Sequence, residues 1–362
     1  MTNPIKFIEF LKFNWMPSTN QKLKIGIIGF GVVGKKRYSI LKRYKQLNIT
    51  AASDINENSL AGLPTSIQTF NDYRKLINES NCNIVFISVP NRFAADATKM
   101  ALKKGMHVFC EKPPARSSRE LSSIKNLIQE KTIKLKYGFN HRYHSSILKA
   151  SEIINSYKLG NIVAMRGMYG KSKIISFDQS DWRSRRSEAG GGILLDQGIH
   201  MLDLMLFFAK EKFKKVFSIV KNDFWNHDVE DNAFALMETS SGIVAQLHSS
   251  ATQWRHKFNL EIILERGALV FGGLLTGSKS YGEETLTVIE SNPDRDKGSP
   301  REKTYTFNRD ISWAEEIKEF IRAIEQDKDI IHGTYEEALL TMKLIEQIYK
   351  ADKLWAKKYY NS

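Results

Sequence analysis

Cysteine is scarce in this chain, and so are long apolar runs. Only two cysteines, Cys82 and Cys110, occur among 362 residues, too few for a disulfide framework or a four-ligand zinc site. This usage predicts a reducing, cytoplasmic location. No run approaches the roughly 18 consecutive apolar residues of a membrane-spanning helix, so we expect no transmembrane segment.

Acidic side chains are almost absent from the first 45 positions, where Glu9 stands against ten lysines and arginines. The whole chain carries a formal charge of +14, which would suit a polyanion. Because no nucleic-acid-binding motif accompanies this charge, we expect no nucleic-acid contact. Residues 1–22 mix apolar and charged side chains, which predicts an amphipathic N-terminal extension packed on protein. Attachment to a membrane surface is the alternative.

Residues 23–140 alternate apolar strand-like runs with amphipathic helical segments. Unbroken apolar strands between helices predict a doubly wound parallel sheet, a Rossmann-type α/β domain. The predicted strands are Leu23–Ile28, Ile49–Ser53, Ile84–Val89, His107–Cys110 and Ile133–Phe139. The predicted helices are Val32–Tyr44, Tyr73–Ser80, Ala94–Lys104 and Ser117–Gln129.

The pattern changes in residues 141–362, which we expect to form a second α/β domain with a largely antiparallel open sheet. Hairpin-like strand pairs follow position 216, and the polar segment Lys279–Arg309 predicts a long exposed loop. The other predicted strands are Ile162–Tyr169, Ala233–Thr239, Ile243–Ser249, Leu260–Leu264 and Leu269–Phe271. The predicted helices are Ile147–Tyr157, Ile193–Phe208, Trp313–Gln326 and Tyr335–Leu354.

A glycine-rich turn follows the first strand and opens the first helix. Its residues are Gly29, Phe30, Gly31, Val32, Val33 and Gly34. Such a turn allows a close backbone approach to a pyrophosphate at a helix N-terminus. Asp54 ends the next strand, at the spacing of the carboxylate that binds the adenosine ribose hydroxyls. The pattern predicts a dinucleotide site that favours NAD over NADP, with Lys35, Lys36 and Arg37 on the exposed side of the helix.

Two segments carry candidate catalytic residues. Glu111 and Lys112 follow the predicted strand His107–Cys110, at the end where ligands bind in parallel α/β sheets. Asp196 and His200 stand four residues apart on a predicted helix, so they share a face, and the aspartate can orient the imidazole. Their alternative interpretation is a helix salt bridge or capping pair. We expect no metal site, because no further histidine or cysteine pattern completes one.

Five motifs follow one another along the chain: GFGVVG at 29–34, SVPN at 88–91, EKPP at 111–114, YGFNHRY at 137–143 and GGGILLDQGIHMLD at 190–203. Taken together, they resemble the glucose–fructose oxidoreductase, inositol dehydrogenase and rhizopine-catabolism (Gfo/Idh/MocA) oxidoreductases. The resemblance implies a substrate-binding second domain that often forms oligomers, here a homodimer or homotetramer. It makes Lys112 the catalytic lysine, Asp196 and His200 an acid–base pair, and Asn91 a neighbour of the nicotinamide ribose. His141 and Arg92 depart from the side chains common in the family.

Trp182, Arg183, Arg185 and Arg186 precede the predicted catalytic helix, and arginine forks bind phosphate or carboxylate. We therefore predict an anionic sugar substrate, with a nucleotide sugar as the first choice, oxidised at a secondary hydroxyl to a keto-sugar. The candidate substrate contacts are Lys112, Arg142, Trp182, Arg183, Asp196 and His200. One alternative is a dehydrogenase of a free polyol, hexose or inositol. A second is a non-catalytic dinucleotide-binding sensor, against which the combined presence of Lys112, Asp196 and His200 argues.

Overall fold

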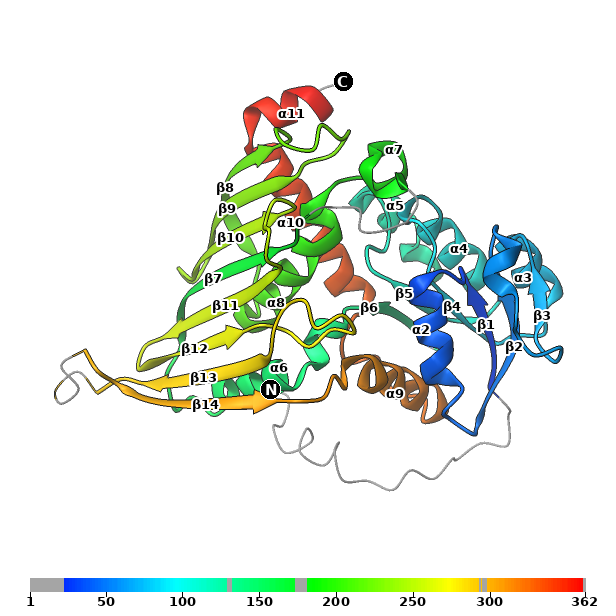
Figure 1. Cartoon of the computed structure of the whole chain (residues 1–362), viewed down its shortest axis with the longest axis horizontal. Coiled ribbons are helices and arrows are strands. Elements are labelled where there is room, and N and C mark those ends of the chain that lie inside the picture. The colour runs from blue at the N-terminus through cyan, green and yellow to red at the C-terminus, as the bar shows by residue number, and fades with distance from the viewer. Residues whose placement is uncertain (1–22, 129–131, 173–180, 293, 295–297, 361–362) are drawn as a thin grey trace.

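Two sheets lie side by side with helices between and around them (Figure 1). The computed structural model describes residues 23–128, 132–172, 181–292, 294 and 298–360. The predicted N-terminal extension, residues 1–22, lies outside these residues.

The first sheet has six parallel strands in the order β3-β2-β1-β4-β5-β6. The inner strands β1 and β4 are almost entirely apolar, as strands covered on both faces are. This arrangement confirms the predicted doubly wound domain. Its strands are β1 (Leu23–Ile28), β2 (Leu47–Ser53), β3 (Gln68–Phe70), β4 (Ile84–Ile87), β5 (His107–Glu111) and β6 (Leu135–Gly138). Its helices are α2 (Val32–Leu41), α3 (Tyr73–Glu79), α4 (Asn91–Lys103) and α5 (Ser118–Ser122).

Helix α5 is much shorter than the predicted helix Ser117–Gln129. The hydroxyls of Ser122 and Ser123 donate to the carbonyls of Ser118 and Glu120, both at 2.7 Å. Such local side-chain bonds compete with the helical backbone pattern. A short 3₁₀ turn, Lys125–Leu127, follows the break.

The second sheet has eight strands in the order β14-β13-β12-β11-β7-β10-β9-β8, with only the β7–β10 pair parallel. The largely antiparallel second domain is therefore confirmed. Its strands are β7 (Ile162–Gly170), β8 (Phe213–Lys221), β9 (Asn232–Thr239), β10 (Val244–Ser250), β11 (Lys257–Leu264), β12 (Gly267–Gly272), β13 (Glu284–Glu290) and β14 (Arg301–Phe307). Its helical segments are α6 (Ser145–Asn155), α7 (Arg186–Ala189), α8 (Ile199–Ala209), α10 (Tyr335–Ala351) and α11 (Lys353–Tyr359).

The segment Lys279–Arg309, predicted to contain a long exposed loop, also contains two strands that the sequence analysis did not predict, β13 and β14. Strand β13 alternates buried Leu286 and Val288 with less buried neighbours. Strand β14 is an edge strand rich in charged residues and threonine, a composition that discourages edge-to-edge association. Its polarity led the sequence interpretation to a loop.

Helix α9 (Ser312–Glu325) belongs by sequence to the predicted second domain but packs on the first sheet. The Phe320 ring lies 5.8 Å from the ring of Phe86 and 5.6 Å from that of Phe109. The guanidinium of Arg37 on α2 pairs at 2.6 Å with Glu316 on α9. The first domain thus needs a helix from near the end of the chain to complete its core.

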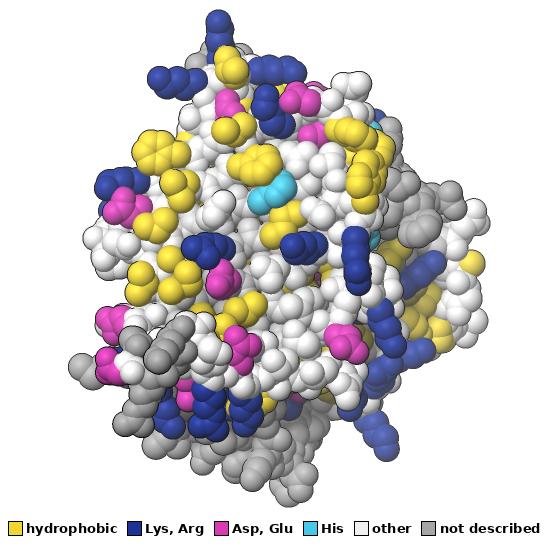
Figure 2. All heavy atoms as spheres, turned by 60° about the vertical axis from the view of Figure 1, so that its left-hand side comes forward, with side chains coloured by type: hydrophobic (Ala, Val, Ile, Leu, Met, Phe, Trp, Pro, Cys, Tyr) yellow, Lys and Arg dark blue, Asp and Glu magenta, His cyan; other side chains and the backbone are white. Residues whose placement is uncertain are grey.

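Helices α8 and α10 cover one face of the second sheet, and its other face is open (Figure 1). Figure 2 shows apolar side chains gathered on this open face, among them exposed Phe217, Ile219, Phe234 and Leu236. Among the described residues, one helical stretch, Arg186–Ala209, has the length and apolar composition of a membrane span. Because 78% of its apolar 18-residue window is buried inside the protein, this stretch is a core helix by packing.

Candidate active site

The glycine turn lies between β1 and α2 and is shaped by close backbone packing. A Cβ at Gly34 would lie 2.0 Å from the carbonyl oxygen of Gly29, and one at Gly29 would lie 2.3 Å from that of Ser88. A Cβ at Gly31, in contrast, would meet no atom within 4 Å. This open space at the N-terminus of α2 fits a pyrophosphate, which needs close approach to free backbone amides.

The other residues of the turn divide between core and surface. The Phe30 side chain is buried and its ring packs 5.5 Å from that of Tyr38, whereas Val32 is exposed. Val33 is half-buried. The Phe30 side chain therefore belongs to the core of the first domain.

Asp54 stands at the carboxyl end of β2, beside the turn. Its carboxylate accepts hydrogen bonds from the backbone of Phe30 at 2.7 Å and of Asn56 at 2.9 Å. These bonds hold the carboxylate next to the glycine turn, where a ribose would lie. The residues present thus fit a nicotinamide dinucleotide.

The basic residues of α2 lie differently from the sequence prediction. Lys35 is exposed, but the Lys36 ammonium lies 3.8 Å from the centre of the Trp313 ring. Arg37 is only 1% exposed and binds Glu111 and Glu316, so its predicted place on the exposed side is wrong. Burial opposes a charged Arg37, but the two carboxylates raise its pKa.

Asn91 and Glu111, predicted to lie beside the cofactor, both have protein partners. The Asn91 amide donates at 2.8 Å to the carbonyl of Ala189, and Glu111 accepts from Arg37. Asn91 thereby ties the end of β4 to the segment before the catalytic helix. Their contacts with a cofactor remain predictions.

Lys112 and Asp196 meet where the two domains face each other. The Lys112 ammonium donates at 2.7 Å to the backbone carbonyl of Asp196, while the Asp196 carboxylate binds Lys171 at 2.7 Å. Arg183 lies 3.6 Å from the same carboxylate. Burial would raise the pKa of Asp196, but Lys171, Lys112 and Arg183 together lower it, so this carboxylate stays ionised. Burial lowers the pKa of Lys112.

A glycine run allows the helix that carries Asp196 and His200 to begin in a crowded place. A Cβ at Gly192 would lie 2.1 Å from the carbonyl oxygen of Glu230. The buried Glu230 carboxylate accepts from the backbones of Gly192 and Leu194 at 2.8 and 3.0 Å, and from the Tyr349 hydroxyl at 2.7 Å. A π-helical turn, Leu194–Gly198, then leads into α8.

His200 is buried near Lys112, but within the part of the chain that the structure describes it makes no hydrogen bond with Asp196. Its Nδ1 is buried without a hydrogen-bond partner in the part of the chain that the structure describes. Its ring stacks 3.6 Å from the ring of His141, at an interplanar angle of 18°. Burial lowers the pKa of His200 well below its ordinary value, and Lys112 adds to this, so the imidazole is neutral. The expected Asp196–His200 pair is thus not formed, because the Asp196 carboxylate binds Lys171 and Gln197 instead.

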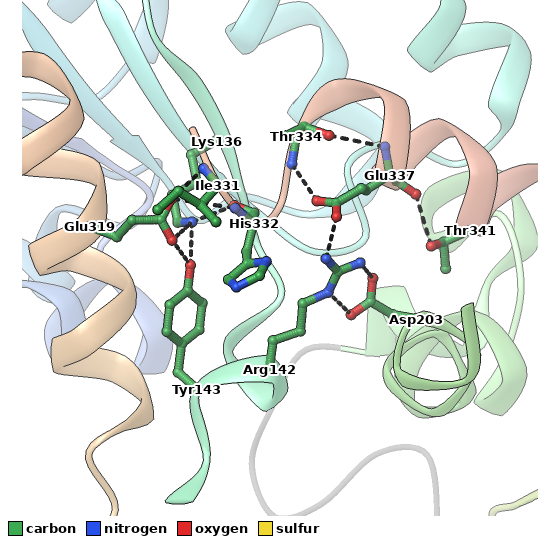
Figure 3. A network of polar contacts seen from close by, with 10 residues as sticks. All are labelled: Lys136, Arg142, Tyr143, Asp203, Glu319, Ile331, His332, Thr334, Glu337 and Thr341. Carbon is green, nitrogen blue, oxygen red and sulfur yellow. Dashed lines mark hydrogen bonds and ion pairs between the residues drawn. The ribbon is translucent and has the colours of Figure 1, made fainter. Parts of the chain in front are cut away.

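Arg142, a predicted substrate contact, is instead part of a buried network (Figure 3). Its guanidinium makes two bonds with Asp203, at 2.7 and 2.8 Å, and a third with Glu337. Burial opposes its charge, but the two carboxylates raise its pKa. The structure therefore contradicts a substrate role for Arg142, because its charge is balanced inside the protein.

The arginines near Trp182 are also occupied. Arg183 lies 4.3 Å from the Trp182 ring as well as near Asp196. Arg186 is surrounded by four aromatic rings near the C-terminus, at 4.3 to 5.9 Å; these belong to Tyr349, Trp355, Tyr359 and Tyr360. The predicted arginine cluster is therefore not an open anion-binding fork. Substrate contacts of Trp182 and Arg183 remain predictions.

The sequence interpretation missed Lys171 as a site residue and gave His141 no role. Lys171 directly follows β7, and its position after an apolar strand opposite the catalytic helix was the available signal. His141 lies in the short 3₁₀ segment Asn140–Tyr143, just after β6. Among the described residues, no group of three or more histidine, cysteine, aspartate or glutamate side chains is placed to hold a metal ion.

These features define a class: a two-domain protein with a dinucleotide fold and a lysine–histidine site between the domains. The family model described as "Oxidoreductase family, NAD-binding Rossmann fold" matches residues 23–139, and the "GFO/IDH/MocA C-terminal domain" matches residues 147–270. The chain belongs to the Gfo/Idh/MocA oxidoreductase family.

Named relatives are similar over different lengths. Glucose-6-phosphate 3-dehydrogenase of Bacillus subtilis is 30% identical over 52% of this chain and 55% of its own length. The chain thus aligns with about half of that relative. Myo-inositol 2-dehydrogenase of Thermotoga maritima is 24% identical over 84% of this chain and 88% of its own. The solved structure of levoglucosan dehydrogenase with NADH has a TM-score of 0.79 at 20% identity, over 92% of this chain and 98% of that one.

Proposed function

We propose that this protein oxidises a secondary hydroxyl of a sugar ring with a nicotinamide dinucleotide. The observation that carries the proposal is the convergence of Lys112, Asp196 and a neutral buried His200 between the glycine-turn domain and the second sheet. A sensor would not need this proton-transfer set. Bound nicotinamide would accept a hydride from the carbon that carries the hydroxyl.

The protein's own groups then handle the hydroxyl proton. Neutral His200 accepts the proton, and Lys112 donates a hydrogen bond to the reacting oxygen. Because burial lowers the pKa of Lys112, this lysine is the alternative base. Asp196 stabilises the positive charge that either base would carry, and it keeps Lys171 and Arg183 in place.

NAD is the proposed cofactor, with NADP less favoured. A carboxylate at position 54 would repel a 2′-phosphate. Two of the three neighbouring basic residues have other partners, because Lys36 lies against Trp313 and Arg37 binds two carboxylates. Of the three, this leaves Lys35 to neutralise a 2′-phosphate. Relatives differ on this point, since one is named as NADP-dependent D-xylose 1-dehydrogenase.

We propose a substrate of monosaccharide size and withdraw the preference for a nucleotide sugar. That preference rested on Arg183, Arg185 and Arg186. Of these, Arg186 is enclosed by aromatic rings and Arg183 lies near Asp196. Similar proteins are named for glucose 6-phosphate, levoglucosan and myo-inositol. Three cations surround the single Asp196 carboxylate, and this excess favours a sugar that carries a phosphate or carboxylate.

The open face of the second sheet is the proposed interface of a homodimer. Its exposed Phe217, Ile219 and Leu236 exceed the scattered apolar side chains that monomers normally expose. A hollow of about 330 Å³ lined by Arg166, His248 and neighbouring side chains adds a polar element to this face. Light scattering of the purified protein tests the proposal, which a monomer at micromolar concentration would contradict. The cytoplasmic location stays a prediction.

The direct test is turnover by the purified chain with glucose, glucose 6-phosphate, myo-inositol and UDP-glucose, each with NAD and with NADP. We expect reduced nicotinamide to form faster with NAD than with NADP, and faster with sugars that carry no nucleotide than with UDP-glucose. Among these sugars, glucose 6-phosphate should react faster than glucose. His200→Ala and Lys112→Ala should each lower kcat roughly 10²- to 10⁴-fold, the usual share of acid–base catalysis. The proposal fails if both variants keep near-normal kcat, and its substrate part fails if UDP-glucose reacts best.

A further inference from the structure

His200 is held by a ring contact rather than by a carboxylate. Its imidazole is 4% exposed and lies 3.6 Å from the parallel ring of His141, which is 5% exposed. The carboxylate expected to orient it, Asp196, binds Lys171 and Gln197 instead. Since Nδ1 of His200 has no partner among the described residues, the orientation of this ring depends strongly on the face of His141.

His141 is itself anchored at both ring nitrogens. Its Nδ1 lies 3.1 Å from the side-chain oxygen of Asn140, and its Nε2 lies 3.0 Å from the hydroxyl of Tyr169. The Asn140 amide nitrogen donates at 3.1 Å to Ser312, whose hydroxyl donates at 2.6 Å to Asp310. The anchor therefore runs from β7 on one side to the start of α9 on the other.

The direction of this chain determines the tautomer of His141. A carboxylate such as Asp310 only accepts, so Ser312 donates to it and accepts from the amide of Asn140. The Asn140 oxygen then faces His141 as an acceptor, which places the His141 proton on Nδ1. Its Nε2 is left to accept from Tyr169.

His141 is thus neutral, and burial, which lowers its pKa well below the ordinary value, acts in the same direction. A charged ring at this place would repel the imidazolium that forms when His200 takes a proton. A neutral ring keeps water from one face of His200 without that repulsion.

We propose that His141 is a positioning residue that holds the His200 ring for proton transfer, the role that the sequence suggested for Asp196. The proposal rests on the proposed function, in which the substrate hydroxyl gives its proton to His200. The O–H bond of the substrate breaks and an N–H bond forms on the imidazole. The carbon that carries the hydroxyl loses a hydride to the bound nicotinamide, and its bond to oxygen becomes a carbonyl double bond.

The test compares His141→Ala and His141→Phe, each alone and combined with His200→Ala. His141→Ala should lower kcat roughly 10- to 100-fold with unchanged KM for NAD, because a small misplacement of a reacting group has this effect. His141→Phe retains the ring face and should recover most of the rate. In the His200→Ala background neither change should matter, since the effect acts through His200.

The pH profile gives a readout that a merely structural role would not move. Among the described residues, the charged groups that act on His200 and His141 are Lys112, which binds the carbonyl of Asp196, and His144, which is paired to Glu284. Tyr169, bound to His141, packs 5.3 Å from the ring of Tyr281. Removal of the His141 ring admits water and raises the pKa of His200. Because the base must be neutral, the acid limb of kcat/KM should move to higher pH in His141→Ala and stay in place in His141→Phe.

A control is His107→Ala. His107 lies at the start of β5, at the opposite end of that strand from Lys112, and its ring accepts a hydrogen bond from the backbone of Lys134 at 3.0 Å. Its loss should leave kcat unchanged. If His141→Ala does not fold, Tyr169→Phe replaces it in the test, because this variant keeps both imidazoles and removes only the hydrogen bond to His141. Tyr169→Phe should lower kcat, but by a smaller factor than His141→Ala.

The outcomes separate the inference from the proposed function. If His200→Ala is inactive while His141→Ala and Tyr169→Phe match the unmutated protein, the inference is wrong and the function stands. The inference is also wrong if His141→Ala lowers kcat by the same factor in the unmutated protein and in His200→Ala. It is wrong as well if His141→Phe has a kcat as low as that of His141→Ala. If His200→Ala retains near-normal kcat, the proposed function itself fails.

Discussion

At the scale of single residues, the charge on Asp196 links several parts of the site. Its carboxylate is 16% exposed and its closest cation, Lys171, is 10% exposed, both at the side chain. A partly buried carboxylate without its cation becomes easier to protonate, because burial opposes the charge. Lys171, not recognised in the sequence, is therefore expected to matter as much as the motif residues.

Lys171→Met should raise the pKa of Asp196 and lower kcat at mildly acidic pH more than at neutral pH. Stability should fall as well, since a buried charge loses its partner. The measurements are the pH profile of kcat and thermal unfolding. Adding Asp196→Asn should restore the unfolding temperature but not the rate. Lys215→Met removes an equally short pair, with Glu238, from the surface and should change neither; a Lys171 variant with the same behaviour would contradict the prediction.

At the scale of elements, the start of the helix that carries Asp196 and His200 depends on a hydrogen-bond acceptor in the connection between β8 and β9. The Glu230 carboxylate takes the place of a helix cap by binding the backbones of Gly192 and Leu194. Glycine at position 192 is required because Glu230 approaches it so closely. The orientation of Asp196 and His200 is thereby coupled to Glu230 and Tyr349.

Glu230→Gln should destabilise the fold by about 1–3 kcal/mol, because an amide NH₂ would face a backbone donor in a buried place. It should also lower kcat while NAD affinity is retained, since the glycine turn lies on the other domain. Calorimetry for NAD and steady-state kinetics check this. Tyr349→Phe, which removes only the hydroxyl bond, should have a smaller effect on both. A Glu230→Gln with normal kcat would show that the helix start is held by other contacts.

The elements also show what the sequence could and could not predict. Apolar runs identified every strand of the first sheet except the three-residue β3, and the motifs located the site at the ends of β1, β4 and β5. Charge patterning failed at β14, where a polar edge strand resembles a loop. The i, i+4 spacing placed Asp196 and His200 on one helix face, but it could not predict which side chains each of them contacts. That choice depends on Lys171 and His141, which come from distant segments.

At the scale of the whole molecule, buried neutral histidines make the fold sensitive to acid. Burial lowers the pKa of His141 and His200 well below the ordinary value, and that of His332 to about 4. In the unfolded chain a histidine has a pKa of about 6.5. The unfolded state therefore binds more protons below that pH, and stability falls as the pH decreases. Glu316, whose pKa burial raises to about 7, acts in the opposite direction.

We expect the unfolding temperature to fall between pH 7 and pH 5, with a loss of roughly 1–2 kcal/mol from His332 alone. Differential scanning calorimetry across this range measures the change. His332→Asn should flatten the pH dependence, whereas His248→Asn, on the open face, should leave most of it. An unfolding temperature that stays constant or rises toward pH 5 would contradict the argument.

The return of α9 to the first sheet has a consequence for synthesis on the ribosome. Strands β1 to β6 emerge early, but the apolar side chains of Phe86 and Phe109 meet Phe320 only after nearly nine-tenths of the chain has been made. Until then the nascent first domain presents an uncovered apolar surface, the kind of surface that chaperones bind. The two domains therefore finish folding together and late, in spite of their separate sheets.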